Sequence, residues 1–259
     1  MARPNFKSQL NILIGRNLSI HLSSSSTLVL LLVQPPLIGY FIGLGWRAQE
    51  PNARTFFVMA VASIWMGCMN ACCEIVKERA VFDRERMFNL NILSYLISKV
   101  VVLAVIAGVQ SILLLVVIGR MVHLQQRLDY HLLYFLVLTF TAVSASGLGL
   151  AISTFARTSY AAAITVPILI IPQIIFSEVL LQENIDKNIP SKIEKCTITK
   201  WSYQALKNVE PDGGGPFLGG FKLQEDEPRW ATFVSSFFML SLACMVFLII
   251  AYFKLSWDT

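Results

Sequence analysis

Charged residues are scarce in this sequence. Only 14% of its 259 residues are Asp, Glu, Lys or Arg, against about a quarter in ordinary soluble domains. Hydrophobic residues make up 55%, and the mean hydropathy is +0.62. Such a chain lacks the polar residues that cover a soluble domain, so the composition predicts an integral membrane protein.

Motifs for nucleotide binding and hydrolysis are absent. The sequence has no G-x-x-x-x-G-K-[ST] loop, and the glycine cluster at 213–220 lacks the required lysine. It has neither a G-x-S-x-G elbow nor an H-E-x-x-H helix. We therefore expect a non-catalytic chain that itself binds no cofactor or metal.

The sequence has few cysteines and no stripe of basic residues that would suit nucleic acid. Of the five cysteines only Cys196 lies in a polar segment, so neither a disulfide framework nor a CxxC metal pair is indicated. The formal net charge is +5, but no stripe of Lys and Arg with interleaved aromatics accompanies it. We expect membrane lipids as neighbours and no nucleic acid as a partner.

Long apolar runs are abundant. Apolar residues at helical spacing near the start predict an amphipathic surface helix within a cytoplasmic segment, 1–26. Six runs of about 20 residues, the length that crosses a bilayer, follow at 27–46, 55–73, 95–118, 132–155, 160–181 and 230–255. We predict an all-α integral membrane protein in which residues 27–259 form a six-helix transmembrane domain.

The placement of Lys and Arg predicts the orientation of these spans. If both termini are cytoplasmic and the long segment 182–229 is left out of the count, most Lys and Arg residues lie on the cytoplasmic side. The segment 74–94 is then a cytoplasmic loop between spans two and three. The long segment 182–229, between spans five and six, becomes an extracytoplasmic loop.

A dense charge cluster sits in the predicted cytoplasmic loop. Residues 74–86 include four acids and four bases, and each charge would cost about 2.5 kcal/mol or more at mid-bilayer, so the cluster lies outside the hydrocarbon. In a helix these charges pair at i,i+3 and i,i+4 spacings. A protein-docking element and a solvated connecting loop both fit this pattern.

Polar residues deep in the predicted spans are neutral, and Glu178 lies near the outer end of span five. The neutral residues are Gln34, Asn70, Gln110 and Gln173. Proton-coupled and many ion-coupled carriers place ionisable residues deep in their spans, so the sequence does not favour that class.

Two blocks of residues resemble those of a known transporter family. The first consists of Glu74, Glu78-Arg79, Phe82, Arg84-Glu85, Tyr95 and Ser98-Lys99. The second consists of Pro167 and Ile171 to Ser177, followed by Lys200 to Leu206. With the six spans and the surface helix, they resemble type-2 ABC transporter permeases, in particular G-subfamily (White-type) half-transporters and bacterial FHA-domain-linked ABC exporters. In this resemblance, 200–206 corresponds to a short aromatic helix in the outer loop.

The resemblance implies a permease subunit of an ATP-driven exporter. Such a subunit moves a hydrophobic, amphipathic or lipid-like substrate out of the cytoplasm or inner leaflet by alternating access. It works with a separate ATPase subunit that binds ATP and Mg²⁺, and with a second permease copy in a homo- or heterodimer. The implied location is the plasma membrane, here a bacterial inner membrane.

The resemblance also implies roles for single residues. A coupling helix at about 78–89 would contact the ATPase, with the coupling residues Glu74, Glu78, Arg79, Phe82, Arg84 and Glu85. The substrate cavity would be lined by Trp65, Met66, Met69, Asn70, Pro167, Ile171, Gln173 and Phe176. The outer gate maps to Val179 and Leu180, beside an unusual Glu178, and two copies of Cys196 could meet in an interchain disulfide.

Two other classes remain open on the residues alone. An energy-independent channel or lipid scramblase would share the neutral spans, and so would a non-transporting membrane scaffold. ATP-free flux would indicate the former, and a loop whose exposure does not change with nucleotide would indicate the latter.

Overall fold

The computed structural model describes residues 6–47, 51–124, 128–177, 179–180, 188–209 and 227–257. Within these ranges every regular element is a helix, which confirms the all-α prediction. The elements are α1 Phe6–Ser23, α2 Ser25–Gly45, α3 Ala53–Ala71, the 3-10 turn η1 Val76–Glu78, α4 Arg79–Met87, α5 Ile92–Met121, α6 Leu128–Phe155, α7 Ser159–Ile175, α8 Asn188–Lys195, α9 Ile198–Lys207 and α10 Glu227–Trp257.

Five of the described helical segments are long and apolar enough to cross a membrane. They contain α2, α3, α5, α6 and α10. The fifth predicted span corresponds to α7, which has 17 residues, contains Pro167 and Pro172, and ends at Ile175. The prediction continued this span to residue 181, whereas the chain already turns at Phe176 and Ser177.

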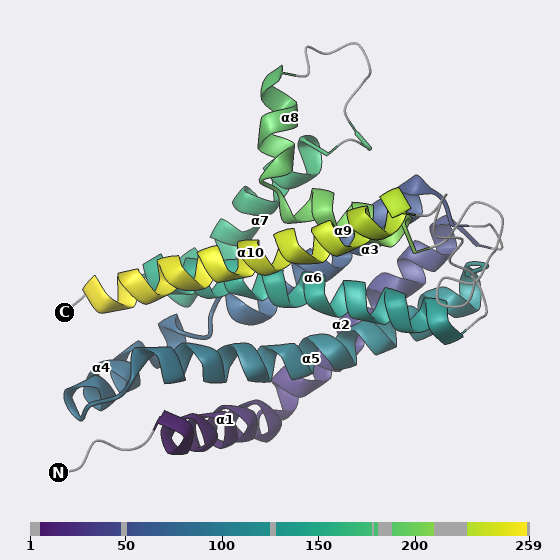
Figure 1. The fold of residues 1–259 in the computed structure, drawn as a ribbon. Helices are drawn as coiled ribbons and strands as arrows, with labels where there is room; N and C mark the ends of the chain where they lie inside the picture. Colours follow the sequence, from purple (N-terminus) through teal and green to yellow (C-terminus); the bar gives the residue numbers. More distant parts are fainter. Residues whose placement is uncertain are drawn as a thin grey trace.

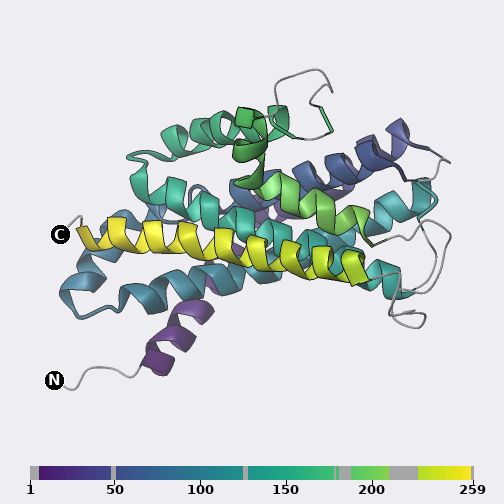
Figure 2. The ribbon, with the colours of Figure 1, turned by 45° about the horizontal axis from the view of Figure 1, so that its top comes forward.

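Helix α6 lies at the centre of the bundle. It packs against α3, α5 and α10, while α2 lies along α5. Figure 1 shows α5, α6 and α10 running side by side, with α1 beside α5. The start of α1, helix α4 and the end of α10 all lie at one end of the bundle in both views (Figures 1 and 2). We call this the α4 end.

The contact between α3 and α6 depends on small residues. A Cβ added at Gly67 would lie 2.1 Å from the Ala142 carbonyl oxygen, and one at Gly149 would lie 2.5 Å from the Cys68 carbonyl oxygen. The Ser146 hydroxyl donates to the Gly67 carbonyl oxygen at 3.1 Å across the same contact. Small residues let membrane helices approach at the backbone, so this helix pair forms the tightest part of the core.

The predicted outer loop, 182–229, is partly helical. Helix α9 contains the 200–206 block and packs against α3, α6 and α10. Thr197 caps it, accepting a hydrogen bond from the Lys200 amide at 3.3 Å, and the Ser202 and Thr141 hydroxyl oxygens lie 2.8 Å apart. Part of the segment predicted as a loop is therefore built into the bundle.

Candidate functional site

The charged segment after α3 folds against the end of α6. The Ser153 hydroxyl oxygen accepts hydrogen bonds from the amides of Ile75, at 2.9 Å, and Val76, at 3.0 Å. These bonds satisfy backbone donors at the start of η1, where the first N–H groups have no partner within the helix. They fix the direction in which the chain leaves α3 and enters η1 and α4.

Lys99 is the centre of a buried charge cluster. Its side chain is 1% exposed, and its Nζ lies 3.0 Å from Glu74 Oε2 and 2.9 Å from Glu78 Oε2. A buried ammonium group is tolerated only when paired. Lys99 belongs to the first block of family-like residues, but the sequence analysis predicts no role for it. The only sequence feature that could have indicated its role is the position of a lysine near the start of a long apolar run.

His21 links the surface helix α1 to this cluster. Its Nε2 lies 3.4 Å from Glu74 Oε2, in the turn beyond the end of α3. Burial raises the pKa of the Glu74 carboxyl, but the hydrogen bond from His21 and the charge of Lys99 outweigh it and lower the pKa to about 2. Glu74 is therefore ionised at neutral pH, so the ammonium of Lys99 faces a full negative charge.

Aromatic packing holds α4 to α5 in the same place. The Phe82 ring is 3% exposed, and its centroid lies 4.9 Å from that of Tyr95. The Tyr95 hydroxyl donates to Glu78 Oε2 at 3.5 Å. Glu74, Glu78 and Phe82, which sequence reasoning placed among the ATPase contacts, thus point into the protein and join α4 to α3 and α5.

The other predicted coupling residues divide into two groups. The Arg79 guanidinium donates to the carbonyl oxygens of Thr154 and Ala156 at the end of α6. Glu85 pairs with Arg16 of α1, while Arg84 is exposed. Only Arg84 and Glu85 therefore face the open surface between α4 and α1.

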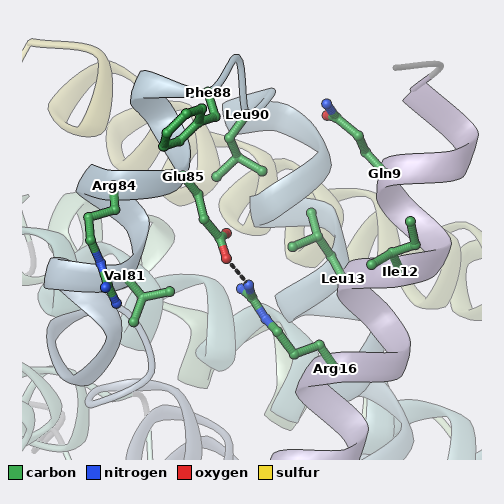
Figure 3. A pocket seen from close by; sticks show the side chains of 9 residues that line it. All are labelled: Gln9, Ile12, Leu13, Arg16, Val81, Arg84, Glu85, Phe88 and Leu90. Carbon is green, nitrogen blue, oxygen red and sulfur yellow. Dashed lines mark hydrogen bonds and ion pairs between the residues drawn. The ribbon is translucent and has the colours of Figure 1, made fainter. Parts of the chain in front are cut away.

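That surface is a groove of about 510 Å³ (Figure 3). Figure 3 shows the Arg16 to Glu85 ion pair joining its two walls. Phe88 and Ile12 are 85% and 69% exposed. The lining residues are Gln9, Ile12, Leu13, Arg16, Val81, Arg84, Glu85, Phe88 and Leu90. The groove thus combines exposed apolar side chains with charges of both signs.

The predicted cavity residues lie on α3, on α7 and just after α7, and the two helices are in contact. Met66 is 1% exposed and belongs to the core, and Trp65 and Met69 pack half-buried against a second apolar cluster. Pro167 and Phe176 are half-buried, whereas Ile171 is 51% exposed. The structure thus distributes these residues between the interior and the outer face of α7.

Asn70, also predicted for the cavity, belongs to an internal hydrogen-bond chain. Its Nδ2 donates to Gln110 Oε1 at 2.6 Å, and Gln110 Nε2 donates to the Leu31 carbonyl oxygen at 3.1 Å. Leu31 lies four residues before Pro35, which has no N–H to bond that carbonyl within α2. Gln110 supplies the missing donor, and the chain joins α2, α3 and α5.

The remaining predicted residues lie at the end of α7. Gln173 Nε2 donates to the Leu169 carbonyl oxygen at 3.2 Å, and its Oε1 is buried without a hydrogen bond in the described structure. Val179 packs against the main core cluster, and Leu180 is 53% exposed. Glu178 lies outside the described residues, and Cys196, after α8, is an exposed free thiol.

An all-helical bundle with five membrane-length segments and a buried charge cluster at one end defines a multi-pass membrane protein. The family model described as "ABC-2 type transporter" matches residues 8–210. The chain therefore belongs to the ABC-2 type transporter family and is a transmembrane permease of an ABC transporter.

The chain is also similar to an ABC transporter ATP-binding/permease protein of Mycobacterium tuberculosis. The two are 25% identical over 217 residues, which cover 76% of this chain and 25% of that protein. The chain thus spans about a quarter of the length of this relative.

Proposed function

We propose that this permease is the membrane subunit of an ATP-driven exporter. It moves a hydrophobic, amphipathic or lipid-like compound from the cytoplasm or inner leaflet outward by alternating access. ATP and Mg²⁺ bind on an ABC ATPase that works with the permease, the partner that membership of the ABC-2 type transporter family suggests. The similar mycobacterial protein is named as both ATP-binding and permease, which supports the pairing of the two functions.

The groove between α1 and α4 is the observation that carries this proposal. Ile12 and Phe88 are exposed, and Arg84 has no hydrogen bond or ion pair with the described residues. This surface suits an amphipathic helix of the ATPase, because such helices dock by placing apolar residues into a groove. The groove is large enough to hold side chains of a partner helix, and its charges of both signs would fix the orientation in which that helix binds. We assign the ATPase contact to Arg84 and Glu85 and to the apolar rim beside them.

The buried cluster supplies the route by which movement of α4 reaches the spans. Lys99 of α5 binds Glu78, at the start of α4, and Glu74, after α3. Closure of the ATP-bound partners would displace α4, and the ion pairs would pass that displacement to α3 and α5. Such a displacement changes transport only if the substrate binds the two states of the permease with different affinity.

A second copy of the permease completes the proposed transporter. Ile164, Ile168, Ile171 and Ile175 are each about half exposed and repeat along one face of α7. This face suits a second copy, with the substrate cavity between α3 and α7 of the two copies and the outer gate at Val179 and Leu180. An apolar cavity lining favours hydrophobic cargo. The proposed setting is the plasma membrane, with both termini cytoplasmic.

The decisive experiment is purification of the tagged chain in mild detergent, followed by transport in vesicles. We expect a stoichiometric subunit that carries a phosphate-binding loop to co-purify with the wild type and with Lys7→Gln. Arg84→Glu should lose that subunit. Vesicles with both subunits should move a lipid-like probe only with ATP.

Two outcomes would contradict the proposal. Flux of the probe without ATP or partner would make the chain a channel or scramblase. A chain that purifies alone in several detergents, with no ATP-dependent flux, would be a scaffold.

A further inference from the structure

A second groove, of about 660 Å³, lies between α6, α7 and α10. Its walls are almost entirely apolar, with Leu148, Ala151, Ile152 and Phe155 from α6, Ala161, Thr165 and Leu169 from α7, and Phe247 and Ile250 from α10. The Thr165 hydroxyl donates to the Ala161 carbonyl oxygen at 2.8 Å, so it presents no free donor to the groove. Volumes of about 300–1,000 Å³ are typical of sites for small molecules.

The groove is basic where α6 ends and α7 begins. Arg157, in the turn between these helices, lines the groove and is exposed, and it has no hydrogen bond or ion pair with the described residues. Arg79 and Arg86, at the same end of the bundle, instead bind carbonyl oxygens of α6 and α10. The guanidinium donors of Arg157 therefore face the groove opening, whereas Arg79 and Arg86 direct donors to backbone carbonyl oxygens.

A second cation lies close to this opening. The Lys254 Nζ lies 5.8 Å from the centroid of the Phe155 ring, and Phe155 lines the groove. The first turn of α7 begins beside Arg157, and helix N-termini favour negative charge. Three positive features therefore surround one end of an otherwise apolar groove.

We propose that this groove binds one anionic phospholipid of the leaflet at the α4 end. The headgroup phosphate binds Arg157 and Lys254, and one acyl chain lies along the apolar walls of α6, α7 and α10. Basic pockets between transmembrane helices recognise anionic headgroups. A zwitterionic lipid would gain the apolar contact but would bring its own cation to a basic opening, and a soluble anion would gain only the charges.

The first test compares two lipids that differ only in headgroup. Purified full-length chain is titrated with phosphatidylglycerol or phosphatidylcholine of the same acyl chains, and bound lipid is counted by native mass spectrometry. We expect phosphatidylglycerol to bind more tightly. Arg157→Gln and Lys254→Gln should each weaken its binding about fivefold, the effect of one basic residue near an anionic surface.

The matched control is Lys7→Gln, which removes an exposed charge at the same end of the bundle but away from the groove. It should leave phosphatidylglycerol binding unchanged. Equal binding of the two lipids, or wild-type binding by the Arg157→Gln/Lys254→Gln double variant, would overturn the proposal. The comparison does not depend on transport, so it stands or fails separately from the proposed exporter function.

A second test locates the acyl chain. Phosphatidylglycerol with a photoactivatable diazirine on its acyl chain should label peptides that contain 148–155, 161–169 and 247–250. Ala161→Trp should fill the groove and suppress this labelling while leaving Arg157 and Lys254 in place, with folding checked by circular dichroism and gel filtration. Labelling spread evenly over α1, α2 and α5, or unchanged in Ala161→Trp, would show that the groove is not the site.

Discussion

Lys99 places a positive charge where almost no water reaches. Its 1% exposed side chain is balanced by Glu74 and Glu78, which are 13% and 18% exposed. Burial of these charges costs free energy that their mutual attraction offsets only while all partners are present. The three residues therefore act as one structural unit, and loss of the cation leaves two carboxylates facing each other.

Replacement of that cation should be severe. We expect Lys99→Met to lower the free energy of unfolding by about 3–5 kcal/mol, the cost of breaking a buried ion pair. Thermal unfolding in detergent would measure it as a lower melting temperature. The triple variant Lys99→Met/Glu74→Gln/Glu78→Gln should recover part of the loss. A triple variant as unstable as the single one would show that packing around the Lys99 stem, and not its charge, holds the cluster.

Gln110 offers a milder test. Gln110→Leu leaves the Leu31 carbonyl oxygen and the Asn70 amide without their partners, and we expect a loss of about 1 kcal/mol, typical of hydrogen bonds between membrane helices. Gln34→Leu is the matched control, because Gln34 has no hydrogen bond in the described structure. If both variants melt alike, the carbonyl freed by Pro35 needs no donor from Gln110.

Helix α4 is held on one side and open on the other. Phe82 and Glu78 attach it to α5, while Arg84 and Phe88 border the groove beside α1. One side of α4 therefore attaches the helix to the rest of the permease, and the other side is the proposed binding surface for the ATPase. Substitutions on the two sides of α4 should therefore affect different steps of the proposed cycle.

The two sides can be compared directly. Arg84→Glu should weaken binding of the ATPase subunit, whereas Glu78→Gln should leave it bound but lower the amount of substrate moved per ATP hydrolysed. Asp83→Lys, an exposed charge reversal on α4 outside the groove, should affect neither. Co-purification measures the first effect, and ATPase and transport rates in the same vesicles measure the second. Loss of binding in all three variants would assign the effect to general charge and not to the groove.

The close approach of α3 and α6 requires glycine at position 67. Gly67→Ala would bring a methyl group to 2.1 Å from the Ala142 carbonyl oxygen, a clash that the backbones must separate to relieve. We expect a loss of about 2 kcal/mol or more in the free energy of unfolding. Gly108→Ala on α5, where the nearest side-chain atom is 3.9 Å away, should be tolerated. Equal melting temperatures for the two variants would contradict the tight packing.

The molecule as a whole has chemically different ends. One end carries α1, α4 and the charge cluster, and the last turn of α2 and the first turn of α3 lie at the other. The distribution of Lys and Arg predicts that the α4 end is cytoplasmic. Lys7, in the first turn of α1, is exposed at the α4 end, and Arg47, just after α2, is exposed at the opposite end.

Single cysteines at these positions test the orientation. In a Cys196→Ser background, which removes the exposed natural thiol, a membrane-impermeant thiol reagent applied to whole cells should label Arg47→Cys. Lys7→Cys should react only after the cells are permeabilised. The reverse pattern would place both termini outside the cytoplasm and remove the groove at α4 from reach of a cytoplasmic ATPase.

Most of the helical framework follows from the sequence. The predicted spans at 27–46, 55–73, 95–118 and 132–155 correspond closely to α2, α3, α5 and α6, and the predicted surface helix to α1. Transfer of an apolar run into lipid, and hydrogen bonding within one helix, depend on consecutive residues alone. A local pattern is therefore enough to locate these elements.

The sequence does not predict which side chains the polar residues contact, and only the tertiary structure determines these partners. The family resemblance implies ATPase contacts for Glu74 and Phe82; in the structure Glu74 is half-buried beside Lys99, and Phe82 packs against Tyr95. Asn70, which the same resemblance places in the substrate cavity, donates a hydrogen bond to Gln110, and Gln110 donates to the Leu31 carbonyl oxygen of α2. The same holds for α9: the family resemblance implies a helix at 200–206, but its packing against α3, α6 and α10 is a feature of the tertiary structure. Each of these contacts joins residues far apart in the chain, and only the packing of whole helices determines which of them meet.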